Sequence, residues 1–358
     1  MKKGVVLVSF FLFSLVLSGC SLTSKNTTTG TVEQYTFSKS IWISKDSGKT
    51  WKESNVTLTK PRLTDINPLN LVFDPQDQNV AYVGLRSGGI MKTTNRGDNW
   101  EFLTFKTDKV YGLAINQTDP KTIYASTVVK NRGKIFKNSN FGANDAWTEI
   151  YTAATNGPLT IQLVIDKKNP NTIYVATSDN QVIKSVDGGV SWRNIFEAPS
   201  PVVKISLDVK DSRLVYLLTK SGEVFFSSNG GDKFESLTKK ITATGLFGSG
   251  FNVIETDPTH GKWIYLAGKT GIIRSKDAGD SWEAIVTLNN PDNSPVGAVA
   301  INPRNSDEII YGAQQATYRS IDGGKNWSTS QFDLPKAVNI LEYNPLDPSI
   351  VYAGFSGN

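Results

Sequence analysis

The eight residues Ser320-Ile321-Asp322-Gly323-Gly324-Lys325-Asn326-Trp327 follow the pattern Ser-x-Asp-x-Gly-x-x-Trp, and this octet decides the fold of the chain. The same pattern begins again at Ser44, Ser185 and Ser275, and three looser copies lie between these. The aromatic residues that close the seven copies are 42 to 49 residues apart, at positions 51, 100, 147, 192, 234, 282 and 327. A period in this range indicates a repeat architecture.

The octet has the composition of a β-hairpin turn. The side chain of Asp or Asn accepts hydrogen bonds from main-chain N–H groups a few residues further on, and Gly adopts a positive φ without steric cost. The Trp begins the next strand and covers the root of the hairpin with a large apolar face. We therefore predict a structural role for the residues at the Asp position, which are Asp46, Asn95, Asn140, Asp187, Asn229, Asp277 and Asp322.

Each repeat also supplies the remaining strands of a propeller blade. An apolar strand ends in a turn that usually reads Asn-Pro or Asp-Pro, as Val299-Ala300-Ile301 does before Asn302-Pro303. A second strand is centred on a tyrosine, and a third strand leads into the octet. The tyrosines are Tyr82, Tyr124, Tyr174, Tyr216, Tyr265, Tyr311 and Tyr352. Four short strands in each repeat predict a blade of a β-propeller.

The two ends of the repeat array decide the number of blades. The first octet, Ser44 to Trp51, has no tyrosine strand before it, and the last tyrosine strand, Ile350 to Gly354, has no octet after it. Joined, these halves complete a seventh repeat and hide the exposed strand edges of an open array. We therefore predict an all-β fold, a seven-bladed propeller with four-stranded blades over residues 37–358, closed by the N- and C-terminal strands.

The N-terminus reads as an export signal. Lys2 and Lys3 precede an apolar run from Val5 to Leu17, which is typical of a secretory signal peptide. The run ends in Leu17-Ser18-Gly19-Cys20, which resembles a bacterial lipobox. We expect residues 1–19 to be removed, Cys20 to be lipidated, and residues 20–36 to form a flexible tether. The protein would then lie outside the cytoplasm, anchored to a bacterial membrane; an incidental cysteine behind a plain signal peptide is the alternative.

Composition excludes several classes of function. Without residues 1–19 the chain has 36 basic and 33 acidic residues. This small positive net charge does not indicate nucleic-acid binding. A single cysteine allows no intrachain disulfide, and a single histidine allows no His-rich metal site. That histidine, His260, lies in the turn after a first strand, where we expect it to be solvated. We expect no cofactor and no metal, and we expect a monomer.

The octet matches the Asp-box, or BNR, repeat, and residues 37–358 resemble bacterial BNR-repeat propeller proteins. The repeat is shared by photosystem II assembly factors, sortilin-like Vps10 domains and xyloglucan-type glycoside hydrolases. The resemblance implies that the octet hairpins lie on the blade rim, away from the ligand face. Vps10 domains are longer and have ten blades, whereas the assembly factors are similar to this chain in size, blade number and export.

The amino-acid sequence of the repeats most resembles that of the glycoside hydrolases. Those enzymes use two propellers with a cleft between them, and the resemblance places one of their acids in the first blade. The corresponding segment here is Tyr82 to Gly89, with Arg86 where that acid would fall. Glycoside hydrolysis needs a pair of carboxylates, and the Arg-Ile-Pro signature of sialidases is missing. We therefore expect a protein without catalytic residues, with a carbohydrate-active hydrolase as the alternative.

The remaining candidate for function is the face opposite the octet hairpins. It is formed by the loops between second and third strands and by those between blades, including the long loop Thr238 to Gly250 with Lys239 and Lys240. We expect this face to bind a protein or an anionic polymer, because complementary charge steers association; ordinary solvated loop charges are the alternative. The predicted binding residues are Arg62, Arg86, Lys106, Lys130, Arg132, Asp179, Lys220 and Lys269.

Overall fold

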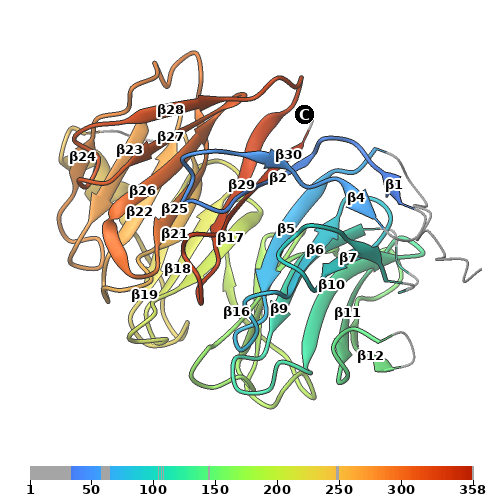
Figure 1. The fold of residues 1–358 in the computed structure, drawn as a ribbon. Coiled ribbons are helices and arrows are strands. Elements are labelled where there is room, and N and C mark those ends of the chain that lie inside the picture. Colours follow the sequence, from blue (N-terminus) through green and yellow to red (C-terminus); the bar gives the residue numbers. More distant parts are fainter. Residues whose placement is uncertain are drawn as a thin grey trace, which may run out of the picture. The chain divides into compact units, whose positions relative to one another are not determined.

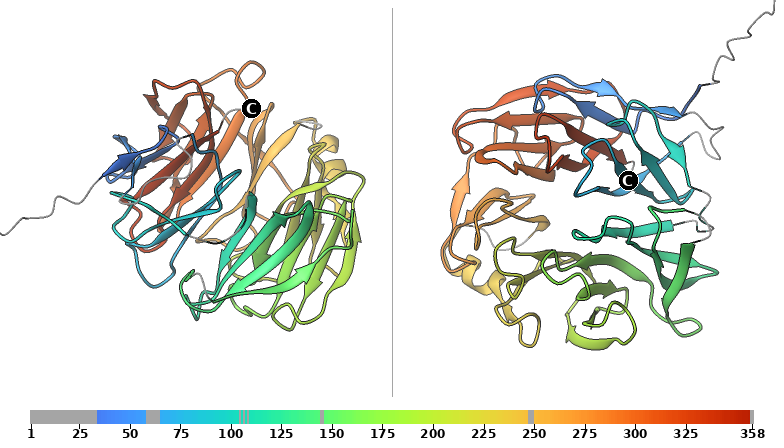
Figure 2. Two further views of the ribbon diagram at one scale, coloured as in Figure 1. Left: turned by 90° about the vertical axis from the view of Figure 1, so that its right-hand side faces the viewer. Right: turned by 60° about the horizontal axis from the view of Figure 1, so that its bottom comes forward.

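The computed structural model describes residues 34–57, 65–103, 105, 107, 109–143, 146–246 and 250–356, which all belong to one compact unit. They form seven antiparallel four-stranded sheets, one two-stranded sheet and one short helix. Figures 1 and 2 show the seven sheets arranged as blades around a common axis. The predicted all-β, seven-bladed propeller is confirmed.

The first two strands of each blade form its inner half, and the second strand is deeply buried. The inner strands are β5 (Pro68–Phe73), β9 (Lys109–Ile115), β13 (Thr160–Ile165), β17 (Val202–Leu207), β21 (Phe251–Thr256), β25 (Val296–Asn302) and β29 (Ala337–Tyr343). The second strands are β6 (Ala81–Leu85), β10 (Ile123–Val129), β14 (Ile173–Thr177), β18 (Val215–Thr219), β22 (Ile264–Gly268), β26 (Asn305–Ala313) and β30 (Val351–Ser356). Each second strand carries one of the predicted tyrosines, and all seven are no more than 2% exposed.

The third and fourth strands complete the blades. The third strands are β7 (Ile90–Thr93), β11 (Arg132–Asn138), β15 (Gln181–Ser185), β19 (Val224–Ser227), β23 (Gly271–Ser275), β27 (Ala316–Ser320) and β2 (Ile41–Ser44). The fourth strands are β8 (Glu101–Phe102), β12 (Trp147–Thr152), β16 (Arg193–Glu197), β20 (Glu235–Ser236), β24 (Glu283–Ile285), β28 (Ser328–Gln331) and β3 (Lys52–Glu53). Because the order within a blade is antiparallel, the octet hairpins and the turns after the inner strands share one edge, the hairpin edge. All other loops lie on the opposite loop edge.

The seventh blade joins the two ends of the described chain. Its strand order is β29-β30-β2-β3, so its inner half is C-terminal and its outer half N-terminal. Ile41 pairs with Gly354 and Ser44 with Val351, and Figure 1 shows the blue strand β2 beside the red strand β30. Ile41 and Ile43 are buried in one cluster with Tyr352 and Leu71 of the first blade. The predicted closure of the ring is therefore confirmed.

The octet hairpins combine a capped turn with a contact to the preceding blade. Asp322 accepts hydrogen bonds from the main-chain N–H groups of Lys325 (3.0 Å) and Asn326 (2.9 Å), which holds the pKa of its carboxyl well below the usual range. Gly324 has a φ of +92°, and a Cβ atom there would overlap Ile285 of the preceding blade. The Trp327 indole N–H donates to the Val286 carbonyl, also in that blade, at 2.8 Å. The hairpin thus links two blades.

Three local features differ from the prediction. In the degenerate copy, Asn138 takes the place of the serine: its Oδ1 accepts from the N–H groups of Asn140 and Gly142 at 2.8 Å, as Ser44 Oγ does from Asp46 and Gly48. The predicted cap, Asn140, has no side-chain hydrogen bond among the described residues. The long loop from Thr238 contains a short helix, α1 (Leu237–Ala243), whose Leu237 and Ile241 are buried. The folded part also begins slightly before residue 37, because β1 (Tyr35–Thr36) pairs with β4 (Val56–Thr57). Residues 20–33 of the segment assigned to the tether lie outside the described residues.

The octet geometry predicts unequal costs for two substitutions in one hairpin. Trp327→Ala removes the contact with Tyr311, whose ring centroid lies 4.7 Å away, together with the bond to the preceding blade. Because Trp327 is only partly buried, we expect a loss of about 2 to 4 kcal/mol, toward the lower end of the range for core aromatics. Asp322→Ala should cost less, since the exposed turn can be hydrated. Denaturant unfolding of both variants measures the difference, and an equal or larger loss for Asp322→Ala would contradict this assignment.

Candidate functional site

A cavity of about 620 Å³ lies between the inner strands of the seven blades. Its lining includes residues from β5, β9, β13, β17, β21, β25 and β29. It also includes Pro75, Pro258, Pro303 and Pro345, which belong to the turns after inner strands, so the cavity extends toward the hairpin edge. Its volume is within the range of small-molecule sites, about 300 to 1,000 Å³. We call it the central cavity.

Three of the charged side chains that line the central cavity lie on the inner strands of different blades. Lys204 on β17 forms a salt bridge with Glu255 on β21, with 3.1 Å between Nζ and Oε1. The two side chains are 38% and 27% exposed, so they remain in contact with the cavity. Glu342 on β29 lines the same cavity and is partly buried. Within the described ranges its carboxylate has neither a hydrogen bond nor a salt bridge.

The environment of Glu342 favours its protonated form. Burial, and after it the negative charge of Glu255, raises the pKa of Glu342 to about 7, although Lys204 and Lys167 act in the opposite direction. The negative charge of Glu255 raises the pKa of Lys204, which therefore stays protonated. The inner strands thus bring two carboxylates and one ammonium group into the cavity, and the carboxylate of Glu342 has no ion-pair partner among the described residues.

Sequence reasoning missed this cluster, although a comparison of the repeats contains the signal for it. Glu255 and Glu342 each stand two residues before the Asp or Asn of the turn that follows the inner strand, Asp257 and Asn344. The other five blades have a small or apolar residue there, namely Val72, Ala114, Val164, Ser206 and Ala300. A carboxylate facing the axis is costly unless it has a function or a partner. The two exceptions to the repeat pattern therefore mark the site.

The amide side chains in the cavity wall have a structural explanation. Asn70 Nδ2 donates to the Val110 carbonyl of the next blade at 3.0 Å. The Gln162 side-chain carbonyl accepts a hydrogen bond from the Ile205 N–H, again across a blade boundary. These bonds join neighbouring inner strands, so each of the two amides contributes to the wall of the cavity, although Asn70 Oδ1 itself is buried without a hydrogen-bond partner among the described residues.

The predicted binding residues are spread around the loop edge. Arg86, Lys130, Asp179, Lys220 and Lys269 are exposed, and each lies in the loop between the second and third strands of a different blade. In the described part of the chain no hydrogen bond or ion pair joins any two of them. Arg62 and Lys106 lie outside the described residues. The loop edge therefore presents separate basic side chains rather than one converging site.

Two of the expected loop-edge cations have structural partners. The half-buried Arg132 donates through Nε to the Ala153 carbonyl at 2.9 Å, which ties β11 to the end of its own blade. Lys240 on α1 pairs with Glu235 and with Asp280, both at 3.1 Å. Asp280 belongs to an octet hairpin, so Lys240 reaches the hairpin edge. The prediction for Lys240 is therefore wrong, because the helix in this loop redirects it.

The single histidine does not complete a hydrolytic triad. His260 Nδ1 lies 3.0 Å from Ser306 Oγ, and that hydroxyl donates to Asp257 Oδ1 at 2.8 Å. In a nucleophilic triad the imidazole stands between the hydroxyl and the carboxylate, whereas here the hydroxyl stands between the other two groups. Ser306 is only 5% exposed. The arrangement joins two blades at the hairpin edge and stabilises the turn of Asp257.

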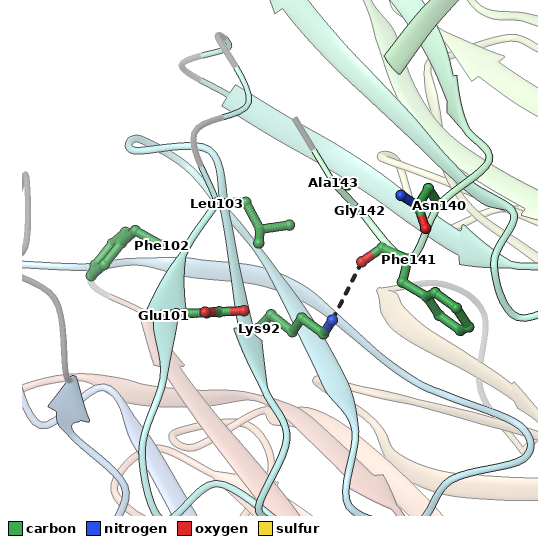
Figure 3. Close-up of a pocket in the computed structure, with 8 residues that line it drawn as sticks. All are labelled: Lys92, Glu101, Phe102, Leu103, Asn140, Phe141, Gly142 and Ala143. Carbon is green, nitrogen blue, oxygen red and sulfur yellow. Dashed lines mark hydrogen bonds between the residues drawn. The ribbon is translucent and has the colours of Figure 1, made fainter. Parts of the chain in front are cut away.

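A second hollow, of about 340 Å³, lies where the first two blades meet. Figure 3 shows Lys92 and Glu101 on one side and the degenerate hairpin around Phe141 on the other. Lys92, the single cation of the lining, already donates to the Phe141 carbonyl at 3.4 Å. The hollow therefore has few free polar groups, and the central cavity is the stronger candidate.

The described residues offer neither a candidate metal centre nor a membrane-spanning helix. They contain no group of three or more His, Cys, Asp or Glu side chains arranged to hold a metal ion. Over the same ranges no helix has both the length and the apolar character needed to cross a bilayer.

The raised pKa of Glu342 predicts how stability changes with pH. Between about pH 4.5 and 7 the folded protein holds a proton that the unfolded chain has released, so raising the pH through this window favours unfolding. We expect Glu342→Gln to match the parent near pH 5 and to be more stable by about 1 to 2 kcal/mol at pH 8, after allowance for solvent in the cavity. The measurement is urea unfolding at both pH values.

The control for this prediction is Glu197→Gln, which changes an exposed glutamate on β16. Its difference from the parent should be the same at both pH values. A Glu342→Gln protein that is no more stable than the parent at pH 8 would show that Glu342 is ionised there without cost.

Family models match two separate parts of the chain. Residues 39–181 match the model of sortilin, neurotensin receptor 3, and residues 194–339 match that of the photosynthesis system II assembly factor YCF48. Each match covers less than half of the chain. No curated protein sequence matches the chain significantly.

Solved structures of two kinds share the fold. The GH74 xyloglucanase from Xanthomonas campestris is 14% identical with a TM-score of 0.66; the match covers 91% of this chain and 52% of the enzyme. The GH74 enzyme from Niastella koreensis is 16% identical with a TM-score of 0.62, covering 81% and 52%. This chain therefore spans about half the length of the hydrolases it matches.

YCF48 structures match over nearly their whole length. YCF48 bound to a D1 peptide is 12% identical with a TM-score of 0.61; the match covers 82% of this chain and 93% of that one. YCF48 from Cyanidioschyzon merolae is 14% identical with a TM-score of 0.61, covering 81% and 95%. Identities this low show the fold alone. Together with the octet repeats and the two family models, they identify the chain as a seven-bladed β-propeller of the BNR, or Asp-box, type.

Proposed function

We propose that this chain is a non-catalytic, lipid-anchored propeller that binds a protein partner or an anionic polymer outside the cytoplasm. The observation that carries the proposal is the contrast between its two edges. The octets at the hairpin edge are engaged in capping turns and joining blades, whereas the loop edge presents exposed Arg86, Lys220 and Lys269 without side-chain partners in the described part of the chain. A similar single propeller, YCF48, has been solved with a bound D1 peptide, which supports a role in protein binding.

A carbohydrate-active hydrolase is the rival function, and the central cavity supplies the observation that favours it. Glu255 and Glu342 line one cavity, and a general acid of a glycosidase needs a raised pKa beside a second carboxylate. Against it, the chain spans half the length of the GH74 enzymes, and Arg86 occupies the position of one of their acids. Reducing-sugar release from xyloglucan, lost in both Glu255→Gln and Glu342→Gln, would favour the hydrolase.

The binding proposal is tested by reversing charge on one edge at a time. We expect Arg86→Glu, Lys220→Glu and Lys269→Glu, combined, to reduce the partner recovered after crosslinking in cells about tenfold, because rim charges govern encounter. Thermal unfolding should change little, since exposed substitutions without partners usually cost less than about 0.5 kcal/mol each.

The matched control carries the same charge change on the hairpin edge. Lys121, Lys233 and Lys325 are also exposed, and their combined change to Glu should leave recovery unaltered. Equal losses for both triple variants would indicate a nonspecific effect of net charge. Full recovery with the loop-edge variant would remove this edge as the binding face.

The anchor is a separate part of the proposal. Cys20 lies outside the described residues, so its support is the order of the Lys2-Lys3 pair, the apolar run and Gly19-Cys20. We expect Cys20→Ala to move the protein from the membrane fraction to the soluble fraction, or to leave it unprocessed. Mass spectrometry of the parent should find a lipidated N-terminal Cys20, and a mature N-terminus elsewhere would contradict the anchor.

A further inference from the structure

The inner-strand charges of the central cavity, Lys204, Glu255 and Glu342, leave an excess of one negative charge. Lys204 and Glu255 form a salt bridge across two blades, and each neutralises the other. Glu342 has no such partner among the described residues, although it lines the same cavity. The ionised form of the Glu342 carboxylate is energetically unfavourable, because burial removes its hydration and the negative charge of Glu255 repels it. A positively charged ligand would relieve both costs.

The kind of cation follows from the surroundings. Ca²⁺ requires six to eight oxygen ligands and Mg²⁺ a near-octahedral set, and no group of three potential ligand side chains exists in the described ranges. An ammonium or guanidinium group needs fewer partners, because it donates directed hydrogen bonds and pairs well with one or two carboxylates. The cavity volume of about 620 Å³ also has room for an organic group.

We propose that the central cavity binds an organic cation, an ammonium or guanidinium group, with Glu342 as its direct counter-ion and the Lys204–Glu255 pair beside it. The cation could belong to a free amine or to a basic side chain of a protein, and the chemistry of recognition is the same. This site is separate from the loop edge, the proposed binding face for the partner, so either proposal can fail without the other.

The hairpin edge supplies a second charge that affects binding. Lys167 and Lys168 line the cavity at the turn after β13. Lys168 Nζ is hydrogen-bonded to the Lys210 carbonyl, whereas Lys167 is exposed and its charge acts on Glu342. Lys167 should therefore weaken the binding of a cation. Replacing Lys167 removes a repulsion, and in the described part of the chain its side chain has no hydrogen bond or ion pair to lose.

Binding should also depend on pH. The charges that act on Glu342 are those of Glu255 from β21, Lys204 from β17 and Lys167 after β13. Asp166, Lys168 and Asp208 also line the cavity, in the turns after β13 and β17. A cation binds the ionised carboxylate, so protonation of Glu342 competes with the ligand. We expect the affinity to fall as the pH is lowered from 8 through 7 to 6, by about tenfold for each pH unit below the pKa of Glu342.

The test uses titration calorimetry of the purified propeller with probes of known charge. Butylammonium and agmatine represent free amines, and an acetylated, amidated Gly-Arg-Gly peptide represents a basic side chain. Butanol and the corresponding citrulline peptide are the neutral controls. At pH 8 we expect saturable binding of at least one cationic probe and none of the neutral ones. Tighter binding of the peptide would assign the cation to a protein, and tighter binding of agmatine to a free amine.

Three variants make the test specific. Glu342→Gln should weaken binding about tenfold or more while folding at least as stably as the parent. Lys167→Gln should strengthen binding about twofold, and Glu197→Gln on the outer strand β16 should leave it unchanged. Absence of saturable binding of every cationic probe by the parent at pH 8 would overturn the proposal. Binding that survives Glu342→Gln undiminished would overturn it as well.

Discussion

The pairing of β2 with β30 is the interaction on which the rest of the structure depends. It joins residues 41–44 to residues 351–354 and makes one blade from the two ends of the described chain. Without it, the second strand of the last blade and the first octet hairpin would each present unpaired edges, which invite aggregation. The central cavity depends on the same pairing, because Glu342 lies on β29, the inner strand of this composite blade.

Closure is reinforced at every blade boundary by the octets. In the hairpin of the seventh blade, a Cβ atom on Gly48 would overlap Ile310 of the sixth, as one on Gly324 would overlap Ile285. The aromatic that closes the hairpin fills the same seam, as Trp51 does against Phe332 at 5.7 Å between ring centroids. The repeat therefore encodes both a turn and the spacing between blades. This dual use explains why glycine and a large aromatic occur together in each complete copy.

The fold could be predicted because its determinants are local and repeated. Each repeat uses the same local features: an Asx turn, a positive-φ glycine and a buried tyrosine strand. The two incomplete repeats at the ends of the array predicted that the ring closes by joining them. Local departures were harder to predict. Asn138 takes the place of the serine in the degenerate turn, and α1 formed because Leu237 and Ile241 can be buried together. The position of Lys240, whose ion pair with Asp280 lies at the hairpin edge, depends on that helix.

The candidate site could not be predicted in the same way, because it depends on what the repeats do not share. Glu255, Glu342 and Lys204 come together only when the inner strands surround one axis, and their spacing in the sequence carries no motif. Each inner strand also has an irregular pairing near its start, as between Pro68 and Asn70, which changes the direction of the side chains before it. Predicting which positions face the axis therefore requires the register.

Closure of the ring is tested most directly by removing Ile350 to Asn358 and following unfolding by circular dichroism and intrinsic fluorescence. The control lacks only residues 357–358, which follow β30. Because the longer deletion removes the strand that joins β29 to β2, we expect it to abolish the single cooperative transition or to cause aggregation, while the control unfolds like the parent. A protein lacking residues 350–358 that stays monomeric and melts cooperatively within a few degrees of the parent would contradict the closed seven-bladed ring.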